Sequence, residues 1–257
     1  MKQEKTLYSA GFGIVLTALL LLLLLFQSES QTNKRPYQRT GNEGSISGTI
    51  SFIGEPPEPK KIDTSADSVC ARTNPNAVTE DVVIADGFVA NVLVYVKEGH
   101  ALDGFTFETP ATPVVLDQRG CRLAPHVFGL QTHQILEVRN SDPTTHNFHA
   151  TPRKNPDWNQ SQPAGADPLT TKFGNPEVAI PLKNNQHPWM KAYAGVFEHP
   201  FFAVTNESGA FSIEGLPPGT YMIAAWHERF GEKTVEVVVT PGSGQYIHLS
   251  FDSMDPR

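Results

Sequence analysis

The chain has 257 residues, with 20 Lys and Arg against 27 Asp and Glu, and 39% of its residues are hydrophobic. The residues after position 44 carry a formal charge of −9 and hold no cluster of basic residues, so a nucleic-acid partner is excluded. A negative mean hydropathy excludes a protein that spans the membrane many times.

The apolar residues are concentrated first at the N-terminus. Leu7–Phe26 is long and apolar enough to cross the lipid bilayer as a helix, which predicts a signal anchor within residues 1–30. The alternative is a cleaved signal peptide, with Ser28 and Ser30 as the small residues before the cut. Residues 31–44 are polar and predict a tether, and we expect the body to lie in the periplasm or another extracytoplasmic space.

Beyond the tether, short apolar runs alternate with Gly, Pro, Asn and Asp, a pattern typical of β-strands and turns. The fold class predicted is therefore mainly β, with two β-sandwiches after the N-terminal transmembrane helix. Residues 151–176 are rich in Pro and Asn and predict a long surface excursion. The predicted strands are Ser45–Ile53, Asp81–Ile84, Val92–Lys97, Pro113–Asp117, Gln134–Asn140, Glu177–Leu182, Tyr193–Phe197, Phe201–Thr205, Ala210–Ile213, Thr220–Trp226, Lys233–Thr240 and Gln245–Phe251.

The C-terminal strands carry a resemblance to a known family. Ala203–Gly231, with its GLPPGTY turn, resembles the carboxypeptidase regulatory-like domain, a small transthyretin-like sandwich. Ser45–Pro59 resembles the first strand of that domain. The resemblance implies that residues 45–104 and 201–257 contribute to one sandwich, interrupted by an insertion.

The inserted residues resemble a cupredoxin. In Arg119–Ala150 a strand that ends in N-S-D is followed by an H-N pair, as in the first half of that fold. Asn184–Phe197 (NNQHPWMKAYAGVF) resembles its second ligand loop, which reads C-x-x-H-x-x-M. The resemblance implies a cupredoxin-like domain over residues 105–200.

The same resemblance implies a metal site. His146 and His187 occupy the positions of the two copper-ligating histidines and Met190 that of the weak axial ligand, but Asn184 stands where the thiolate ligand is required. We therefore expect the fold to be kept and no cofactor to be bound. The alternative is a thiolate-free copper or zinc site built from His146, His187 and Met190, which His149 and His126 could join.

Cys70 and Cys121 are the two cysteines of the chain and lie 51 positions apart. An even number of cysteines in an exported body predicts a disulfide, which by loop entropy would contribute about 4 kcal/mol to stability. The alternative is a pair of reactive or metal-binding thiols, although no C-x-x-C spacing is present.

No catalytic motif is found, so the sequence predicts a protein that is not an enzyme. One anchor, a tether and two sandwiches predict an accessory or scaffolding subunit of an integral membrane protein complex, with electron transfer in respiration or photosynthesis as the expected setting. The alternative is a copper carrier or electron-transfer protein. The aromatic interface candidates are Trp158, Trp189, Phe201 and Phe202. The alternative is that Trp189, Phe201 and Phe202 fill the junction between the sandwiches.

Overall fold

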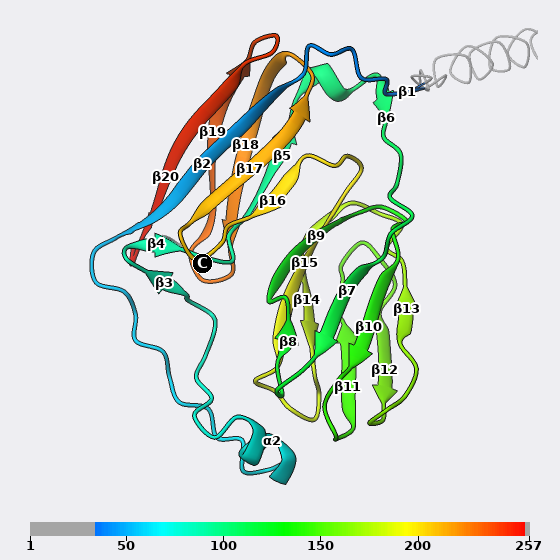
Figure 1. Cartoon of the computed structure of the whole chain (residues 1–257), viewed down its shortest axis with the longest axis vertical. Coiled ribbons are helices and arrows are strands. Elements are labelled where there is room, and N and C mark those ends of the chain that lie inside the picture. Colours follow the sequence, from blue (N-terminus) through cyan, green and yellow to red (C-terminus); the bar gives the residue numbers. More distant parts are fainter. Residues whose placement is uncertain (1–33, 255–257) are drawn as a thin grey trace, which may run out of the picture. The chain divides into compact units, whose positions relative to one another are not determined.

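The computed structural model describes residues 34–254, which form a mainly β protein (Figure 1). Its strands build two pairs of sheets, which we call the terminal sandwich and the central sandwich. Within the described residues, helix is confined to α2 (Ser68–Thr73) and the 3-10 turn η1 (His100–Leu102). The predicted membrane helix Leu7–Phe26 lies outside this range, and no helix in residues 34–254 is long and apolar enough to cross a membrane.

The terminal sandwich combines strands from both ends of the described chain. One sheet has the order β16-β5-β18-β19, and the other has the order β17-β2-β4-β3, with β20 paired to β2. Its strands are β2 (Gly44–Ile53), β3 (Ile84–Ala85), β4 (Phe88–Val89), β5 (Leu93–Glu98), β16 (Phe202–Val204), β17 (Ala210–Leu216), β18 (Gly219–His227), β19 (Gly231–Val239) and β20 (Gly244–Asp252).

The alternation of β2 explains its central place in this sandwich. Ile46, Ile50 and Phe52 point into the core, and the residues between them face outward, as a period of two requires. Gly48 lies on the inward side as well, where a Cβ atom would come within 2.9 Å of the Phe211 ring. Glycine is therefore required at this position by close packing rather than by an unusual backbone angle.

The central sandwich is formed by the strands in between. Its sheets have the orders β13-β10-β7-β8 and β12-β11-β14-β15-β9, with β7 parallel to β10 and β9 parallel to β15. Its strands are β7 (Val114–Gln118), β8 (Leu123–Ala124), β9 (Val127–Gln131), β10 (Leu136–Asn140), β11 (His146–Ala150), β12 (Trp158–Gln162), β13 (Leu169–Thr171), β14 (Glu177–Lys183) and β15 (Lys191–Phe197). A short parallel pair, β1 (Arg35–Pro36) and β6 (Phe105–Thr106), precedes it.

Two expectations about this region are corrected. Residues 151–176 contain β12 and β13, so they are not one surface excursion. The sequence WNQSQ of β12 does not predict a strand, because this edge strand exposes most of its side chains and therefore lacks an alternating apolar pattern. Strand β9 was also missed, since its central Gly129 interrupts the apolar pattern.

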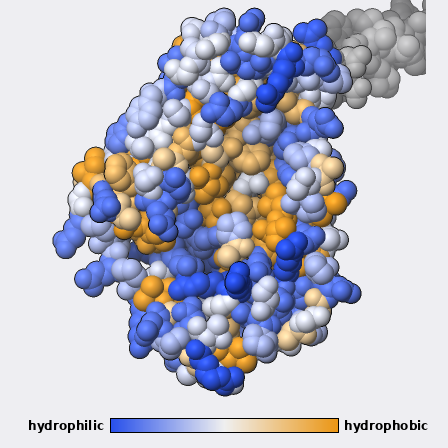
Figure 2. Space-filling model, in the orientation of Figure 1, coloured by the Kyte–Doolittle hydropathy of each residue, from blue (hydrophilic) through white to orange (hydrophobic). Residues whose placement is uncertain are grey.

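Aromatic side chains fill the junction between the sandwiches. Phe202 stacks on Phe197 with ring centroids 4.9 Å apart and lies so close to Gly129 that a Cβ there would meet its ring at 2.3 Å. Phe201 is buried in the terminal core. Phe201 and Phe202 therefore pack within the chain, which was the alternative for them, and a partner contact at either residue stays a prediction. On the face shown in Figure 2, hydrophobic residues gather mostly around the middle of the view.

The segment between β2 and β3, which we call the strap (residues 54–83), reaches from the terminal sandwich to the central one. The predicted disulfide is confirmed: Cys70 of α2 is bonded to Cys121, which follows β7, and their Cα atoms are 5.5 Å apart. Asn74 also donates to the carbonyl oxygen of Gly120, at 3.3 Å. Arg122 forms an ion pair with Glu80 at 2.5 Å. The strap is thus fastened near one end of the central sandwich.

Candidate functional site

The structure brings together the four residues that the cupredoxin resemblance singled out. His146 is the first residue of β11, and Asn184, His187 and Met190 lie in the turn between β14 and β15. Hydrogen bonds from Met190 N to His187 O (2.9 Å) and from Asn184 N to Met190 O (3.1 Å) close this turn. All four side chains are buried, and His187 is the most exposed at 4%.

The amide of Asn184 has one orientation that satisfies its surroundings. Its Oδ1 accepts hydrogen bonds from the backbone N–H groups of Gln186 (2.8 Å) and His187 (3.0 Å). Because an amide oxygen accepts and an amide nitrogen donates, Nδ2 must point the other way. It lies 3.1 Å from His146 Nδ1 and 3.5 Å from Met190 Sδ. The amide therefore donates to two of the atoms that would ligate a metal.

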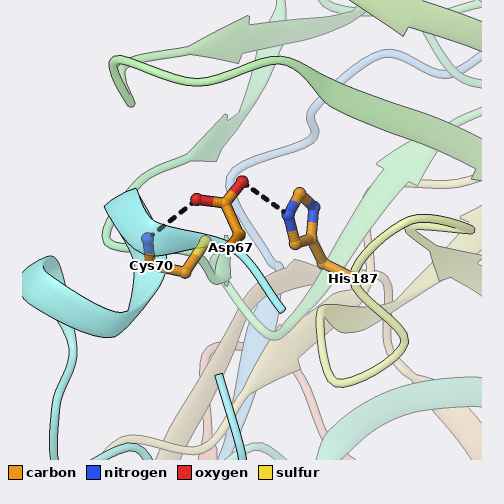
Figure 3. Close-up of side chains that lie close together, drawn as sticks. All are labelled: Asp67, Cys70 and His187. Carbon is orange, nitrogen blue, oxygen red and sulfur yellow. Dashed lines mark hydrogen bonds and ion pairs between the residues drawn. The ribbon is translucent and has the colours of Figure 1, made fainter. Parts of the chain in front are cut away.

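The two histidines are linked to each other and to two carboxylates. Their Nδ1 atoms are 3.2 Å apart, while the Nε2 atom of each faces an aspartate. His146 Nε2 lies 2.9 Å from Asp142 Oδ2, and His187 Nε2 lies 3.1 Å from Asp67 Oδ2, the contact drawn in Figure 3. Because carboxylates only accept, each Nε2 is the donor in its contact, whereas the roles of the two Nδ1 atoms depend on the tautomer of each ring. The result is a chain of hydrogen bonds from Asp67 to Asp142.

Both carboxylates are held in the ionised form. Burial acts to raise the pKa of Asp67, but hydrogen bonds from Cys70 N, Thr144 and His187 outweigh it and lower the pKa to about 2. Burial also acts to raise the pKa of Asp142. Hydrogen bonds from His146 and from the backbone N–H groups of Cys121 and Gly120 reverse its effect and lower the pKa below the usual value. Two negative charges therefore flank the histidine pair.

Each carboxylate is positioned by the segment that carries one of the cysteines. Asp67 caps α2, where its Oδ1 accepts from the N–H groups of Val69 (2.7 Å) and Cys70 (3.2 Å). Asp142 accepts from Gly120 N at 2.7 Å and from Cys121 N at 2.8 Å. The disulfide thus connects the two backbone segments that hold the carboxylates in place.

In this orientation the Asn184 amide opposes a cation at the histidine pair. The Asn184 amide presents hydrogens, which carry positive partial charge, to His146 Nδ1 and Met190 Sδ. Rotating the amide would turn its NH₂ group toward the N–H groups of Gln186 and His187, which are also donors. Neither cysteine can supply the missing thiolate while both are in the disulfide.

The other histidines weighed for the site lie elsewhere. His149 lies 2.9 Å from Asp157 and 3.2 Å from Asn185, at the surface. His126 pairs with Glu228 of the terminal sandwich. Neither joins the histidine pair.

Two of the aromatic interface candidates lie close to the site or its strands. Trp189 packs beside His187, with ring centroids 5.2 Å apart, and donates to the carbonyl oxygen of Cys121 at 3.1 Å. Trp158 packs on Phe148 at 5.2 Å. Both tryptophans are partly exposed, and their role as partner contacts stays a prediction.

Sequence reasoning missed the two aspartates. Asp142 could have been found, because it lies in the N-S-D segment four residues before His146. Asp67 has no such signal, since it is 120 positions away from His187 in the chain and the strap that carries it shows no periodic pattern.

No protein-family model and no curated protein matches the chain. Among solved structures, it is similar to a copper-containing nitrite reductase from Thermus scotoductus SA-01, at 18% identity over 40% of this chain, with a TM-score of 0.32. The chain spans 28% of the length of that reductase. It is also similar to a mutant of amicyanin (13% identity, 35% of this chain and 86% of that one, TM-score 0.30). A purple cupredoxin from Nitrosopumilus maritimus matches at 14% identity over 32% of this chain and 98% of its own, with a TM-score of 0.28. Similarity at this level carries no inference about function.

Proposed function

We propose that this protein is a non-enzymatic accessory subunit whose cupredoxin-like half does not transfer electrons. The observation that supports this proposal is the orientation of the Asn184 amide, fixed by two backbone donors so that its NH₂ group contacts His146 and Met190. In this orientation the amide presents hydrogens to two of the atoms that would ligate a metal. The histidine pair and its two aspartates, Asp67 and Asp142, then form a buried network of hydrogen bonds, which we call the clamp.

The clamp has a mechanical role in this proposal. Asp67 lies on the strap, which connects β2 and β3 of the terminal sandwich, whereas His146 and His187 lie in the central sandwich. The hydrogen-bonded chain and the disulfide together fasten the strap to the central sandwich. Such a cross-link gives a rigid two-sandwich body, which suits a recognition or scaffolding surface.

The proposed location is the extracytoplasmic side of a membrane, next to an integral membrane protein complex. This part of the proposal is supported by the apolar run Leu7–Phe26 and the polar residues that follow it. Solubilisation of the full chain in a mild detergent and affinity purification test it. We expect integral membrane proteins to co-purify with it in fixed proportion. A monomer without partners in the detergent extract would contradict the proposed association with a membrane complex.

Copper retention tests the loss of the redox centre. Purified oxidised protein is incubated with copper ions and then dialysed, and the retained metal is measured. We expect far less than one equivalent to remain, with no difference between wild type and His187→Ala, because the amide opposes a cation. Stoichiometric retention that disappears in His187→Ala would contradict the proposal.

A thiolate-free copper site is the second candidate function, and one observation favours it. The Nδ1 atoms of His146 and His187 face each other at 3.2 Å, and each outer nitrogen is oriented by a carboxylate, as is common for histidines that bind metals. His146, His187 and Met190 would hold Cu(I), whose affinity for thioether sulfur suits Met190. The copper experiment above decides between the two.

A further inference from the structure

The disulfide lies between two sets of potential metal ligands. Asp67, Cys70 and His187 form one set, which we call the strap group, and their ligand atoms lie within 4.8 Å of one another. Figure 3 shows the Asp67 carboxylate between Cys70 and His187. Cys121, Asp142 and His146 form the strand group, with the same limit on their distances. Each group therefore contains one sulfur, one carboxylate and one imidazole.

The bond between Cys70 and Cys121 joins the two groups through their sulfur atoms. As long as this bond is intact, neither sulfur can act as a thiolate ligand. Both cysteines are fully buried, and they are the two cysteines of the chain. The thiolate that is missing at Asn184 is thus present nearby, in masked form.

We propose that reduction of the Cys70–Cys121 bond creates a binding site for a divalent cation of the zinc class. A dithiol donates two electrons and two protons to the bond and becomes a cyclic disulfide, while Cys70 and Cys121 become thiols. Binding of the cation then releases the two thiol protons, and the two thiolates ligate it. A carboxylate from each group completes the coordination, and an imidazole replaces it only when its Nε2 hydrogen is released as a further proton.

The donor set determines the class of cation. Zinc is bound by thiolate, imidazole and carboxylate in tetrahedral sites, and these are the three ligand types that the two groups supply. Calcium and magnesium require oxygen ligands in larger number, so the thiolates disfavour them. Two negative thiolates also outweigh the positive partial charge that excludes a cation beside Asn184.

This inference goes beyond the proposed function, because it concerns different atoms of the same histidines. The nitrogens that face the carboxylates are Nε2, whereas Asn184 contacts Nδ1 of His146. The amide can therefore stay in place when the new site forms. The oxidised protein tests the Nδ1 centre and the reduced protein tests the sulfur site, so failure of one is distinguishable from failure of the other.

Access to the sulfur atoms requires the strap to open. Apart from α2, the strap has one isolated β-bridge, between Lys61 and Val78, so few backbone hydrogen bonds oppose local opening. Its contacts with the central sandwich are the disulfide, the Asp67 contacts with His187 and Thr144, and the interactions of Arg122 and Asn74. Reduction removes the covalent contact and leaves hydrogen bonds, ion pairs and the packing of Cys70 in the central core.

Cobalt(II), which absorbs light strongly when it is bound by thiolates, is the probe for this site. Folded protein is treated with a phosphine reductant, free thiols are counted, and cobalt is titrated into the reduced and the untreated protein. We expect two titratable thiols and a thiolate-to-cobalt charge-transfer band that saturates at a single equivalent, only in the reduced sample. Excess zinc should remove the band, because zinc prefers the same ligands.

Variants identify the ligands. We expect the band to disappear in the Cys70→Ser/Cys121→Ser double variant and to fall by about half in either single variant, because one thiolate remains. His149→Gln replaces a surface histidine of the central sandwich that belongs to neither group and should keep the full band, which makes it the matched control. A disulfide that resists reduction in the folded protein would overturn the proposal, as would reduced protein with two free thiols and no band.

Discussion

The buried histidines of the two sandwiches have different partners. In the terminal sandwich, His199 lies with Nε2 3.1 Å from the carbonyl oxygen of Val96 and accepts from Phe201 N at 3.2 Å. His227 accepts from Arg229 N at 3.1 Å and stacks on Phe230. Burial lowers the pKa of His199 and of His227 to about 4, so both are neutral at pH 7.

In the central sandwich, the outer nitrogens of His146 and His187 face ionised carboxylates, and their inner nitrogens face each other. The difference shows that burial alone does not determine the role of a histidine, which depends also on its hydrogen-bond partners. Main-chain partners make a histidine a neutral packing residue. Carboxylate partners make it part of a network that carries a hydrogen or could carry a cation.

Among the variants, the one that lacks the disulfide is expected to have the largest effect. Cys70→Ala with Cys121→Ala should lower the free energy of unfolding by about 4 kcal/mol, because a bond across 51 positions restricts the unfolded chain. Denaturant unfolding of wild type and double variant, both without reductant, measures this. A loss below about 1 kcal/mol would show that the strap is held without the bond.

The terminal histidines should make stability depend on pH. Above pH 6.5 they are neutral in both the folded and the unfolded chain. As the pH falls from 6.5 to about 4, the unfolded chain gains protons that the folded protein does not, so stability decreases. The loss is about 3 kcal/mol per histidine at pH 4. Denaturant unfolding at several pH values should show that the free energy of unfolding falls less steeply with pH in His227→Gln than in wild type. An equally steep fall would contradict the role of His227 in this pH dependence.

Cutting the central network tests the role of Asp142. Asp142→Ala leaves Gly120 N, Cys121 N and His146 Nε2 without an acceptor and should cost about 2 kcal/mol of unfolding free energy. Asp157→Ala is the matched control, since Asp157 is exposed and pairs with His149 at the surface. Its effect should stay below about 1 kcal/mol. Equal losses in the two variants would remove the distinction between network and surface pair.

The smallest effect is expected at the strap. Asp67→Ala removes the cap of α2 and the acceptor of His187 and should cost about 1 kcal/mol. Asp67→Ser keeps an oxygen that can cap α2, but the shorter serine side chain lacks the second oxygen that contacts His187. Its loss of unfolding free energy should therefore be intermediate. Thermal unfolding compares the two, and a Ser variant as stable as wild type would show that the clamp contributes nothing measurable.

Much of the fold could be predicted from period-two alternation, as β2, β18 and β20 illustrate with inward Ile46, Ile223 and Phe251. The polar edge strand β12 could not, because an edge strand with exposed side chains lacks that pattern. The cysteine pair was predictable from its even number, and the structure confirms it.

The candidate site was only half visible in the sequence. His146, His187, Met190 and the substitution at Asn184 follow from the motif spacing. The direction of the Asn184 amide depends on two backbone donors in a folded turn, and Asp67 reaches His187 only through the path of the strap. Such contacts depend on tertiary geometry, for which spacing along the chain gives no signal.

The central claim is that Asn184 separates this site from a copper centre. The absorption spectrum of Asn184→Cys after incubation with Cu(II), beside wild type and Asn184→Ser, tests it most directly. The account predicts an intense thiolate-to-copper band in Asn184→Cys alone, with the Cys70–Cys121 bond still intact by peptide mapping. A colourless Asn184→Cys protein that binds no copper, or wild type that binds copper as well as the variant, would contradict the claim.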